Sequence, residues 1–216
     1  MTWNGYRPSD DVCEYGYLVP SNMFVTVVFD YLCKNAEKAD VKDMRAEMET
    51  LVSEISEGIQ KFAVVDSEFG KIYAYEVDGL GGVNLMDDAN VPSLLSLPYL
   101  GYCTADDPVY KNTRRFVLSE KNPYYFKGKA AAGVGSPHTP EKYIWHIGVI
   151  MQLLTSADAE ERRRCMETLL NTDAGCEVMH EGFHCDDPSR YTRPWFCWAN
   201  TLFALAVTEM SGRGEL

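Results

Sequence analysis

Acidic, basic and aromatic side chains concentrate between residues 179 and 200. Within this stretch, Glu181 lies between His180 and Gly182, and His184 follows three residues later. A glycine lets the backbone bend so that the neighbouring carboxylate can project into a pocket, where a carboxylate can act as a general base. The segment therefore predicts the wall of an active site.

The same residues also fit the H-E-x-x-H pattern, in which two histidines on one helical face bind zinc and the glutamate is the base of a metalloprotease. Glu209 lies downstream, where such enzymes can place a third ligand. However, Gly182 disfavours a helix interior by about 1 kcal/mol. Asp173-Ala174-Gly175 and Asp187-Pro188 leave little room for a helix on either side. The segment is predicted to be a loop, and a zinc protease is the remote alternative.

Charged and aromatic neighbours offer further roles around this segment. Arg190 and Arg193 are predicted to hold Asp186, Asp187 or Glu181 in place through bidentate pairs. Trp195 and Trp198 are three residues apart, which puts them on one face of a helix. One of them is expected to form a platform under a sugar ring, and core packing is the alternative.

Overall charge and composition exclude several classes of partner. The 20 basic and 32 acidic residues give a net charge of −12, which opposes binding to nucleic acids and anionic membranes. Seven cysteines, an odd number without a C-x-x-C pair, favour free thiols in a reducing compartment. No apolar run reaches the roughly 20 residues that span a bilayer, and no signal sequence is evident. A cytoplasmic protein without a membrane segment is predicted.

Apolar and charged segments with helical periodicity alternate along the chain. Apolar helices are predicted at 23–32, 89–100, 142–154 and 191–207, charged helices at 41–62, 107–120 and 157–170, and a short strand or hairpin at 69–77. Polar loops precede the apolar helices at 10–11, 87–90, 136–140 and 186–188, a weak repeat of roughly 50 to 80 residues. This pattern predicts a mainly all-α fold, an α/α toroid with functional loops on one rim. Four inner and three outer helices make up about half of a closed ring of six pairs.

Four motifs in order, at 5–11, 86–95, 133–139 and from 180–184 to 198–200, resemble glycoside hydrolase family 125. The resemblance runs from about residue 2 to about residue 207. It implies an inverting exo-α-1,6-mannosidase with an (α/α)6 barrel. It also implies that 1–216 is a single catalytic-type domain that lacks the N-terminal half of the barrel.

The resemblance further implies the roles of three carboxylates. Inverting hydrolysis needs one carboxylic acid to protonate the leaving oxygen and a second carboxylate to activate water on the opposite face. By the resemblance, the acid is Asp10 or Asp11 and the base is Glu181. Adjacent residues on an extended segment point opposite ways, so the other aspartate is expected to cap a helix or pair with Arg7. The substrate is expected to be a mannose-containing oligosaccharide, with no cofactor and no metal.

Substrate contacts are predicted for a set of polar and aromatic residues: Arg7, Asp87, Asp88, Asn90, His138, Trp145, His180 and His184. Helix capping is the alternative for the residues of 87–90. His146 could also line the sugar site, but it lies within an apolar helix, where a hydrogen-bonded core histidine is equally expected.

A different class of function is an inactive half-barrel that acts as a binding or partner subunit. Half a barrel would expose the apolar faces of 23–32 and 142–154, which would seek the missing N-terminal half or a partner chain. Because both the acid and base motifs are present, we expect such a loss to concern closure and binding more than the catalytic groups.

Overall fold

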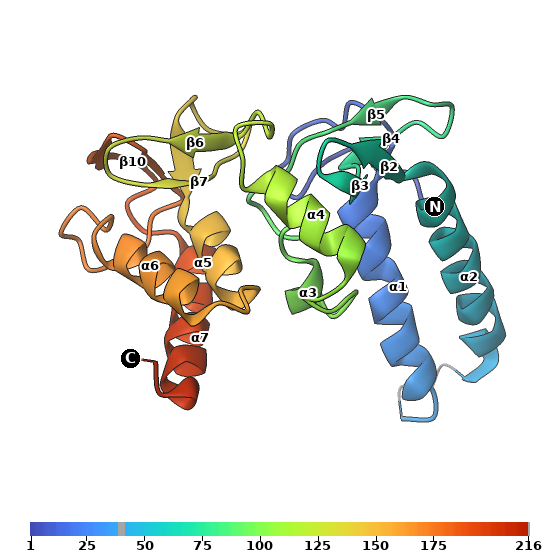
Figure 1. The fold of residues 1–216 in the computed structure, drawn as a ribbon. Coiled ribbons are helices and arrows are strands. Elements are labelled where there is room, and N and C mark those ends of the chain that lie inside the picture. Colours follow the sequence, from blue (N-terminus) through green and yellow to red (C-terminus); the bar gives the residue numbers. More distant parts are fainter. Residues whose placement is uncertain (39–41, 216) are drawn as a thin grey trace. The chain divides into compact units, whose positions relative to one another are not determined.

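The computed structural model describes residues 1–38 and 42–215 (Figure 1). The chain forms two compact units. Unit 1 contains Met1–Leu85 and Pro92–Thr113, and unit 2 contains Met86–Val91 and Arg114–Leu216. The chain passes between the units three times, and the third crossing, after Thr113, falls within helix α4 (Pro108–Val117). The assignment of 1–216 to one catalytic-type domain stays a prediction.

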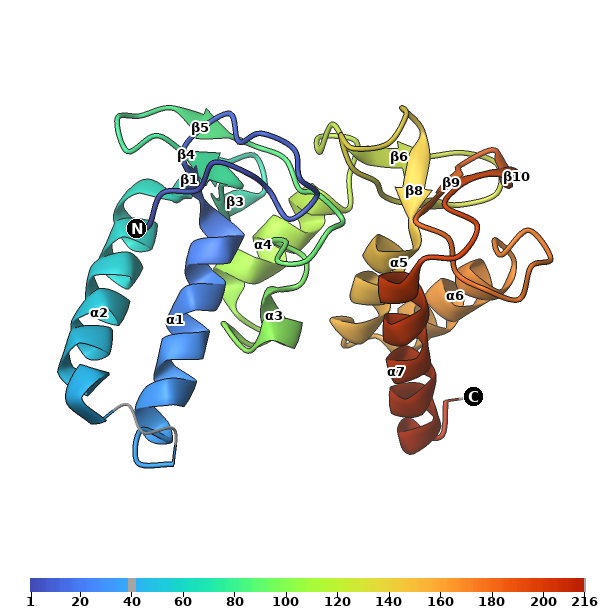
Figure 2. The ribbon, with the colours of Figure 1, turned by 180° about the vertical axis from the view of Figure 1, so that it is seen from behind.

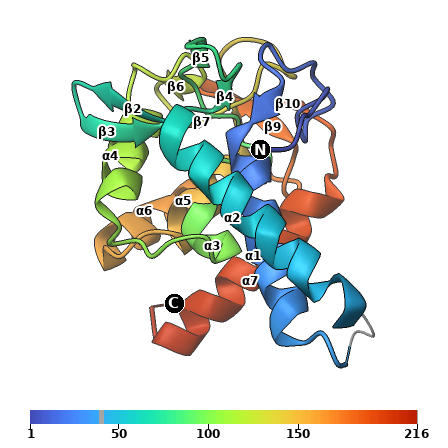
Figure 3. The same ribbon diagram turned by 90° about the vertical axis from the view of Figure 1, so that its right-hand side faces the viewer.

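Two long helices form one side of unit 1. Helix α1 (Val19–Lys34) packs against α2 (Arg45–Phe62), which follows the short 3-10 helix η1 (Lys42–Met44). Figure 3 looks onto α2, with α1 behind it. The apolar residues of α2 recur on one face, and Met48, Ile55 and Ile59 are buried there. The helices predicted at 23–32 and 41–62 are thus confirmed, although residue 41 lies outside the described residues.

Short antiparallel strands complete unit 1. Strands β1 (Tyr17–Leu18), β4 (Glu76–Val77) and β5 (Val83–Asn84) form one sheet in the order β1-β4-β5, and β2 (Val64–Ser67) pairs with β3 (Gly70–Tyr73). The β2–β3 turn closes with Ser67 opposite Gly70, whose φ of 100° suits glycine. The hairpin predicted at 69–77 is confirmed, and it begins earlier, at residue 64.

The helix predicted at 89–100 is wrong for most of its length. Only α3 (Leu97–Leu100) is helical. Before it, Ser93 and Ser96 bond each other's backbone through their hydroxyls, and Asp88 Oδ1 accepts the N–H of Asn90 at 3.0 Å. Such local side-chain bonds compete with helical ones, and Pro92 removes a donor. The segment is therefore a buried loop, with residues 86–91 in unit 2.

Helix α5 (His146–Leu154) is the centre of unit 2 and contacts α6 (Ala159–Leu170) and α7 (Cys197–Arg213). Most of its residues are buried. Gly148 permits a close approach, because a Cβ there would lie 2.8 Å from the carbonyl oxygen of Val134 and 3.1 Å from Cβ of Ala89. The segment 86–91 therefore packs against α5.

The remaining predicted helices, α4 and those of unit 2, are confirmed with shifted bounds. The helix predicted at 142–154 begins at His146, because 143–145 forms strand β8 (Tyr143–Trp145). Those predicted at 107–120 and 157–170 correspond to α4 and α6, and the one predicted at 191–207 begins only at Cys197.

A sheet that the sequence analysis missed covers one end of α5 (Figure 2). Strands β8, β9 (Gly182–His184) and β10 (Asp187–Thr192) pair antiparallel in the order β10-β9-β8, and β6 (Tyr125–Lys127) pairs with β7 (Ala132–Val134). The fold is mainly helical, but it contains more β structure than one hairpin. No helix in the described part of the chain is long and apolar enough to cross a membrane.

Candidate active site

Glu181 lies immediately before β9, and its backbone N–H bonds the carbonyl oxygen of Thr192 at 3.3 Å. The residue is 5% exposed. Oε1 of Glu181 is 2.8 Å from Nε of Arg193, so a nearly buried carboxylate is held by a guanidinium. Of the pairs predicted for Arg193, the structure shows the one with Glu181, through this contact of Nε.

Arg193 holds this position with an unusual backbone. Its φ is 46°, in the left-handed region that non-glycine residues seldom adopt. Its guanidinium also lies 5.6 Å from the centroid of the Phe196 ring. Strained residues of this kind persist where the surrounding structure fixes them, often at functional sites. Here the turn between β10 and α7 aims Arg193 at Glu181.

His180 holds the chain that leads into Glu181. Its ring is fully buried, with Nδ1 2.8 Å from the carbonyl oxygen of Pro194 and Nε2 3.1 Å from that of Asp173. It also stacks on Tyr191, with the ring centroids 3.8 Å apart and the planes 6° apart. Both ring nitrogens thus face backbone groups of the protein. This arrangement favours a supporting role for His180 over the direct substrate contact that the sequence predicted.

His146 supports the same segment from α5. Nδ1 of this buried ring lies 3.0 Å from the backbone nitrogen of His180 and 2.9 Å from its carbonyl oxygen. Nε2 lies 3.1 Å from Oγ1 of Thr172, whose hydroxyl donates to the carbonyl oxygen of Thr168. Burial lowers the pKa of His146 from 6.5 to about 4, which keeps the ring neutral. Of the two roles expected for His146, the structure supports the hydrogen-bonded core histidine.

The backbone conformation of residues 180–184 contradicts the zinc-protease alternative. The H-E-x-x-H mechanism requires both histidines on one helical face, whereas residues 182–184 form β9 and 180–181 precede it as a loop. In addition, both ring nitrogens of His180 lie at hydrogen-bonding distance from carbonyl oxygens. The prediction of a loop in place of a helix is confirmed, with a short strand at its end.

Gly182 is needed for packing more than for bending. It lies in β9 opposite Trp145, and a Cβ on Gly182 would lie 3.1 Å from Cδ1 of the Trp145 indole. Trp145 is 1% exposed and donates its indole N–H to Thr139 Oγ1 at 2.9 Å. In this chain the Trp145 ring supports the sheet from inside, in place of the predicted sugar contact.

The two tryptophans near α7 are exposed, 61% at Trp195 and 55% at Trp198. Neither ring is packed in the core of this chain. Trp195 precedes the helix, which begins at Cys197, so the two rings do not share a helical face. Asn200, in α7, ties this region to the Glu181 segment, because its amide bonds both the N–H and the carbonyl oxygen of Met179.

In unit 1, Asp10 and Asp11 lie on a tight turn closed by a bridge between Tyr6 and Val12. The backbone N–H of Arg7 bonds the carbonyl oxygen of Asp11 at 2.8 Å, and that of Asp10 bonds the carbonyl oxygen of Arg7 at 3.0 Å. Asp10 is exposed, with a φ of 69° that aspartate tolerates better than most residues. Asp11 is half-buried, and its Oδ2 accepts the Ser9 hydroxyl at 2.8 Å. The turn presents the two carboxylates differently, as expected.

The side chain of Arg7 is largely buried in an ion pair with Glu76. Its Nε donates to Glu76 Oε1 at 2.6 Å, and the two side chains are 8% and 0% exposed. Glu76 was not singled out from the sequence, because its partner is 69 residues away and no local pattern links them. The predicted substrate contact of Arg7 stays a prediction.

Asp87, Asp88 and Asn90 are all buried in unit 2. The backbone N–H of Asp87 bonds Asn122 Oδ1 at 3.1 Å, and Asp88 Oδ1 caps the N–H of Asn90. The structure thus assigns Asp88 a local capping role, although in a loop and not at a helix start. Asn122, which fixes this loop, was missed because a lone buried asparagine has no sequence signature.

His138 is exposed on the loop after β7, and its ring packs edge-on to Trp145 with 6.2 Å between centroids. His184 ends β9, half-buried, and packs edge-on to Tyr143. Among the predicted sugar contacts in unit 2, these two histidines keep accessible surface. Their contact with substrate stays a prediction.

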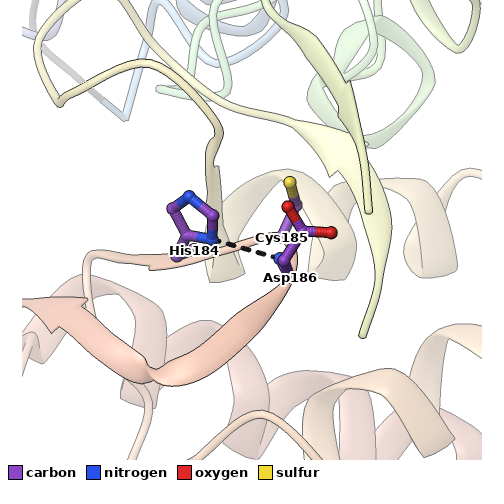
Figure 4. Close-up of side chains that lie close together, drawn as sticks. All are labelled: His184, Cys185 and Asp186. Carbon is purple, nitrogen blue, oxygen red and sulfur yellow. Dashed lines mark hydrogen bonds between the residues drawn. The ribbon is translucent and has the colours of Figure 1, made fainter. Parts of the chain in front are cut away.

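His184, Cys185 and Asp186 form a group of metal-ligand types within 4.8 Å in the described part of the chain (Figure 4). Nδ1 of His184 accepts the N–H of Asp186 at 3.2 Å, and Asp186 Oδ1 accepts the N–H of Lys129 at 2.9 Å. Burial, then the Asp186 charge, raises the pKa of the Cys185 thiol, which disfavours the thiolate that a metal binds. The donors serve a turn between two strands and do not form a good metal site.

Comparison with known proteins decides the family. The sequence profile described as "Metal-independent alpha-mannosidase (GH125)" matches residues 1–208. The chain belongs to glycoside hydrolase family 125. This confirms the resemblance drawn from the four motifs.

Two relatives extend the comparison of this family-125 chain. It is 43% identical over 212 residues to the Meiotically up-regulated gene 157 protein of Schizosaccharomyces pombe. The aligned region covers 97% of this chain and 42% of the relative. It is also similar to a solved metal-independent alpha mannosidase of Streptococcus pneumoniae in a non-productive complex with alpha-1,6-mannobiose. That similarity has a TM-score of 0.94 and 49% identity over 97% of this chain and 50% of the other. The chain thus spans about half the length of the proteins that it matches.

Proposed function

We propose that this chain supplies the catalytic carboxylates of an inverting, metal-independent exo-α-1,6-mannosidase. The observation that supports it best is the family match over residues 1–208, which contains Glu181 as a nearly buried carboxylate held by Arg193. The solved Streptococcus pneumoniae relative, bound to alpha-1,6-mannobiose, supports a substrate of mannose-containing oligosaccharides.

In the proposed reaction, a bond from water oxygen to the anomeric carbon C1 forms while the bond from C1 to the glycosidic oxygen breaks. Glu181 takes a proton from a water whose oxygen bonds to C1, while Asp10 or Asp11 gives its proton to the glycosidic oxygen as the C1–O bond breaks. Because water attacks the face opposite the leaving group, α-linked mannose is released as the β anomer. Glu181 ends protonated and the aspartate ionised, and solvent restores both.

The surroundings of Glu181 suit a base. A carboxylate that takes a proton from water has to carry its charge before the step, and Arg193 compensates that charge at 2.8 Å. His180 and His146 fix the backbone on the N-terminal side of Glu181, and β9 fixes it on the other. A base fixed from both sides meets the positional demand of a general base.

The decisive variants are Glu181→Gln, Asp10→Asn and Asp11→Asn in the native protein that contains this chain. We expect Glu181→Gln and one of the aspartate variants to lower kcat on α-1,6-mannobiose by at least about 10²-fold, with the fold intact by circular dichroism. Full activity of Glu181→Gln would contradict the assignment of the base.

A chelator separates acid–base hydrolysis from zinc chemistry. We expect EDTA to leave mannosidase turnover unchanged, because the proposed mechanism uses only carboxylates. A loss of activity that added zinc restores would overturn the metal-independent mechanism and revive the zinc alternative.

We further propose that this chain is about half of an (α/α)6 barrel and is completed by the N-terminal half of the family fold. An exposed stripe on α1 supports this: Phe24, Val28 and Tyr31 are 36%, 37% and 62% exposed at helical spacing. The other face predicted to be open, 142–154, is buried in unit 2, so that part of the expectation is wrong.

A complementation experiment tests this completion. We expect the 216-residue chain, coexpressed with the N-terminal half of the Streptococcus pneumoniae mannosidase, to form a one-to-one complex by light scattering. Aspartate at Val28 would weaken the complex, whereas aspartate at exposed Glu54 of α2 would not. A chain that stays monomeric beside its complement would contradict the proposal.

A further inference from the structure

Glu76, in β4, is a buried carboxylate that ties together three segments of unit 1. Its side chain is 0% exposed. Oε1 accepts Nε–H of Arg7 at 2.6 Å. Oε2 accepts three donors, namely the backbone N–H groups of Glu14 at 3.0 Å and Tyr15 at 3.3 Å and the amide of Asn84 at 3.1 Å.

These donors lie on both sides of the turn that carries the two aspartates. Arg7 is three residues before Asp10, and Glu14 is three residues after Asp11. One carboxylate therefore clamps both ends of the turn, where the N-terminal segment passes β4 and β5 (Figure 2).

The charge of Glu76 is well compensated. Burial by itself raises the pKa of this carboxyl, but hydrogen bonds from Arg7 and Asn84, the Arg7 charge and the Tyr15 backbone N–H outweigh it and keep the pKa below its usual value. An ionised carboxylate accepts at both oxygens and donates at neither. The two oxygens of Glu76 thus accept four hydrogen bonds, whereas a neutral glutamine would have only one acceptor oxygen to offer these donors.

We infer that Glu76 is a positioning residue that fixes the general acid of the proposed mannosidase, Asp10 or Asp11, by clamping both ends of its turn. This inference rests on the proposed function. Glu76 itself touches no reacting atom. Its removal is expected to impair protonation of the leaving group, while leaving the base unaffected.

Leaving-group dependence tests this role in the native protein. In Glu76→Gln, an NH₂ group, which only donates, replaces one of the acceptor oxygens and faces the N–H groups that this oxygen accepted. We expect kcat on α-1,6-mannobiose to fall about 10²-fold, because a displacement near 1 Å costs this much. On α-mannosyl fluoride, whose leaving group needs no proton, kcat should change less than about threefold. Hydrogen exchange of peptide 4–16 should accelerate.

Two further variants control the result. Glu161→Gln removes a comparable carboxylate in unit 2, which accepts from Arg114 at 3.0 Å and Gln152 at 2.8 Å. It should change neither the substrate ratio nor exchange in peptide 4–16. If Glu76→Gln does not fold, Asn84→Ala removes one donor and keeps the Arg7 pair, and it should shift the substrate ratio in the same direction by a smaller factor.

Asp10→Asn and Asp11→Asn, measured on the same two substrates, separate the possible failures. In the first outcome, one of the aspartate variants slows the hydrolysis of mannobiose but not that of the fluoride, whereas Glu76→Gln and Asn84→Ala slow both reactions equally or not at all. The positioning role of Glu76 is then overturned, and the proposed function stands. If neither aspartate variant discriminates between the substrates, the acid assignment is overturned and the role of Glu76 with it.

Discussion

The buried ring of His146 makes a quantitative prediction about pH and stability. In the folded chain the ring is buried between His180 and Thr172, and burial disfavours its charged form. Its pKa is lowered from 6.5 to about 4 by burial. Between these values the unfolded chain binds a proton that the folded chain does not, so the free energy of unfolding must fall as the pH falls.

The magnitude follows from the two pKa values. Each pH unit between them is worth about 1.4 kcal/mol, so the whole window is worth about 3 kcal/mol. Between pH 7.5 and 5.5 the expected loss is about 1.3 kcal/mol. This interval lies above the range in which carboxylates titrate, so their contribution to the measured loss is small.

The assay is urea unfolding of the wild type and of His146→Gln at pH 7.5 and 5.5. Glutamine can accept from His180 and donate to Thr172, but it does not titrate. We expect the wild type to lose about 1.3 kcal/mol more than the variant between the two pH values. An equal loss in both proteins, or a wild type that is more stable at pH 5.5, would refute the account of His146.

Three other substitutions have defined expectations. Arg193→Ala removes the partner of Glu181. Because the Arg193 side chain is 60% exposed, we expect the free energy of unfolding, measured with urea, to fall by only about 1 kcal/mol. A fall of more than about 3 kcal/mol would show that the pair is more deeply buried than described. Gly182→Ala places a methyl 3.1 Å from the Trp145 ring and should cost about 1–3 kcal/mol with a changed near-ultraviolet circular dichroism spectrum; an unchanged spectrum and stability would contradict the packing described for β9. Trp145→Phe removes the hydrogen bond to Thr139 along with part of the ring and should lower the melting temperature, whereas an unchanged melting temperature would count against a supporting role for Trp145.

Long periodic helices could be predicted from the sequence, and short irregular elements could not. Helix α2 repeats its buried residues, Met48, Ile55 and Ile59, over about three turns, which fixes its period. Strands β8 and β9 have three residues each, too few to distinguish a period of 2 from one of 3.6. The segment 89–96 is apolar enough to suggest a helix, but hydrogen bonds to serine and aspartate side chains, which depend on the tertiary fold, make it a loop.

The candidate site shows the same division. Arg193 could be predicted as a partner of Asp186, Asp187 or Glu181 because all are close in sequence and opposite in charge, and the structure shows the pair with Glu181. Glu76 could not be found, because its donors come from residues up to 69 positions away. Trp145 was misassigned because an aromatic ring before an apolar helix suits a sugar platform and a buried sheet equally well, and only its 1% exposure distinguishes them.

The most direct test of the central claim is to follow the hydrolysis of α-1,6-mannobiose by ¹H NMR, with the native protein and its Glu181→Gln variant. The account predicts that β-mannose appears first and mutarotates later, and that the variant is inactive. Initial release of α-mannose, or undiminished turnover by Glu181→Gln, would contradict an inverting mannosidase that uses Glu181 as its base.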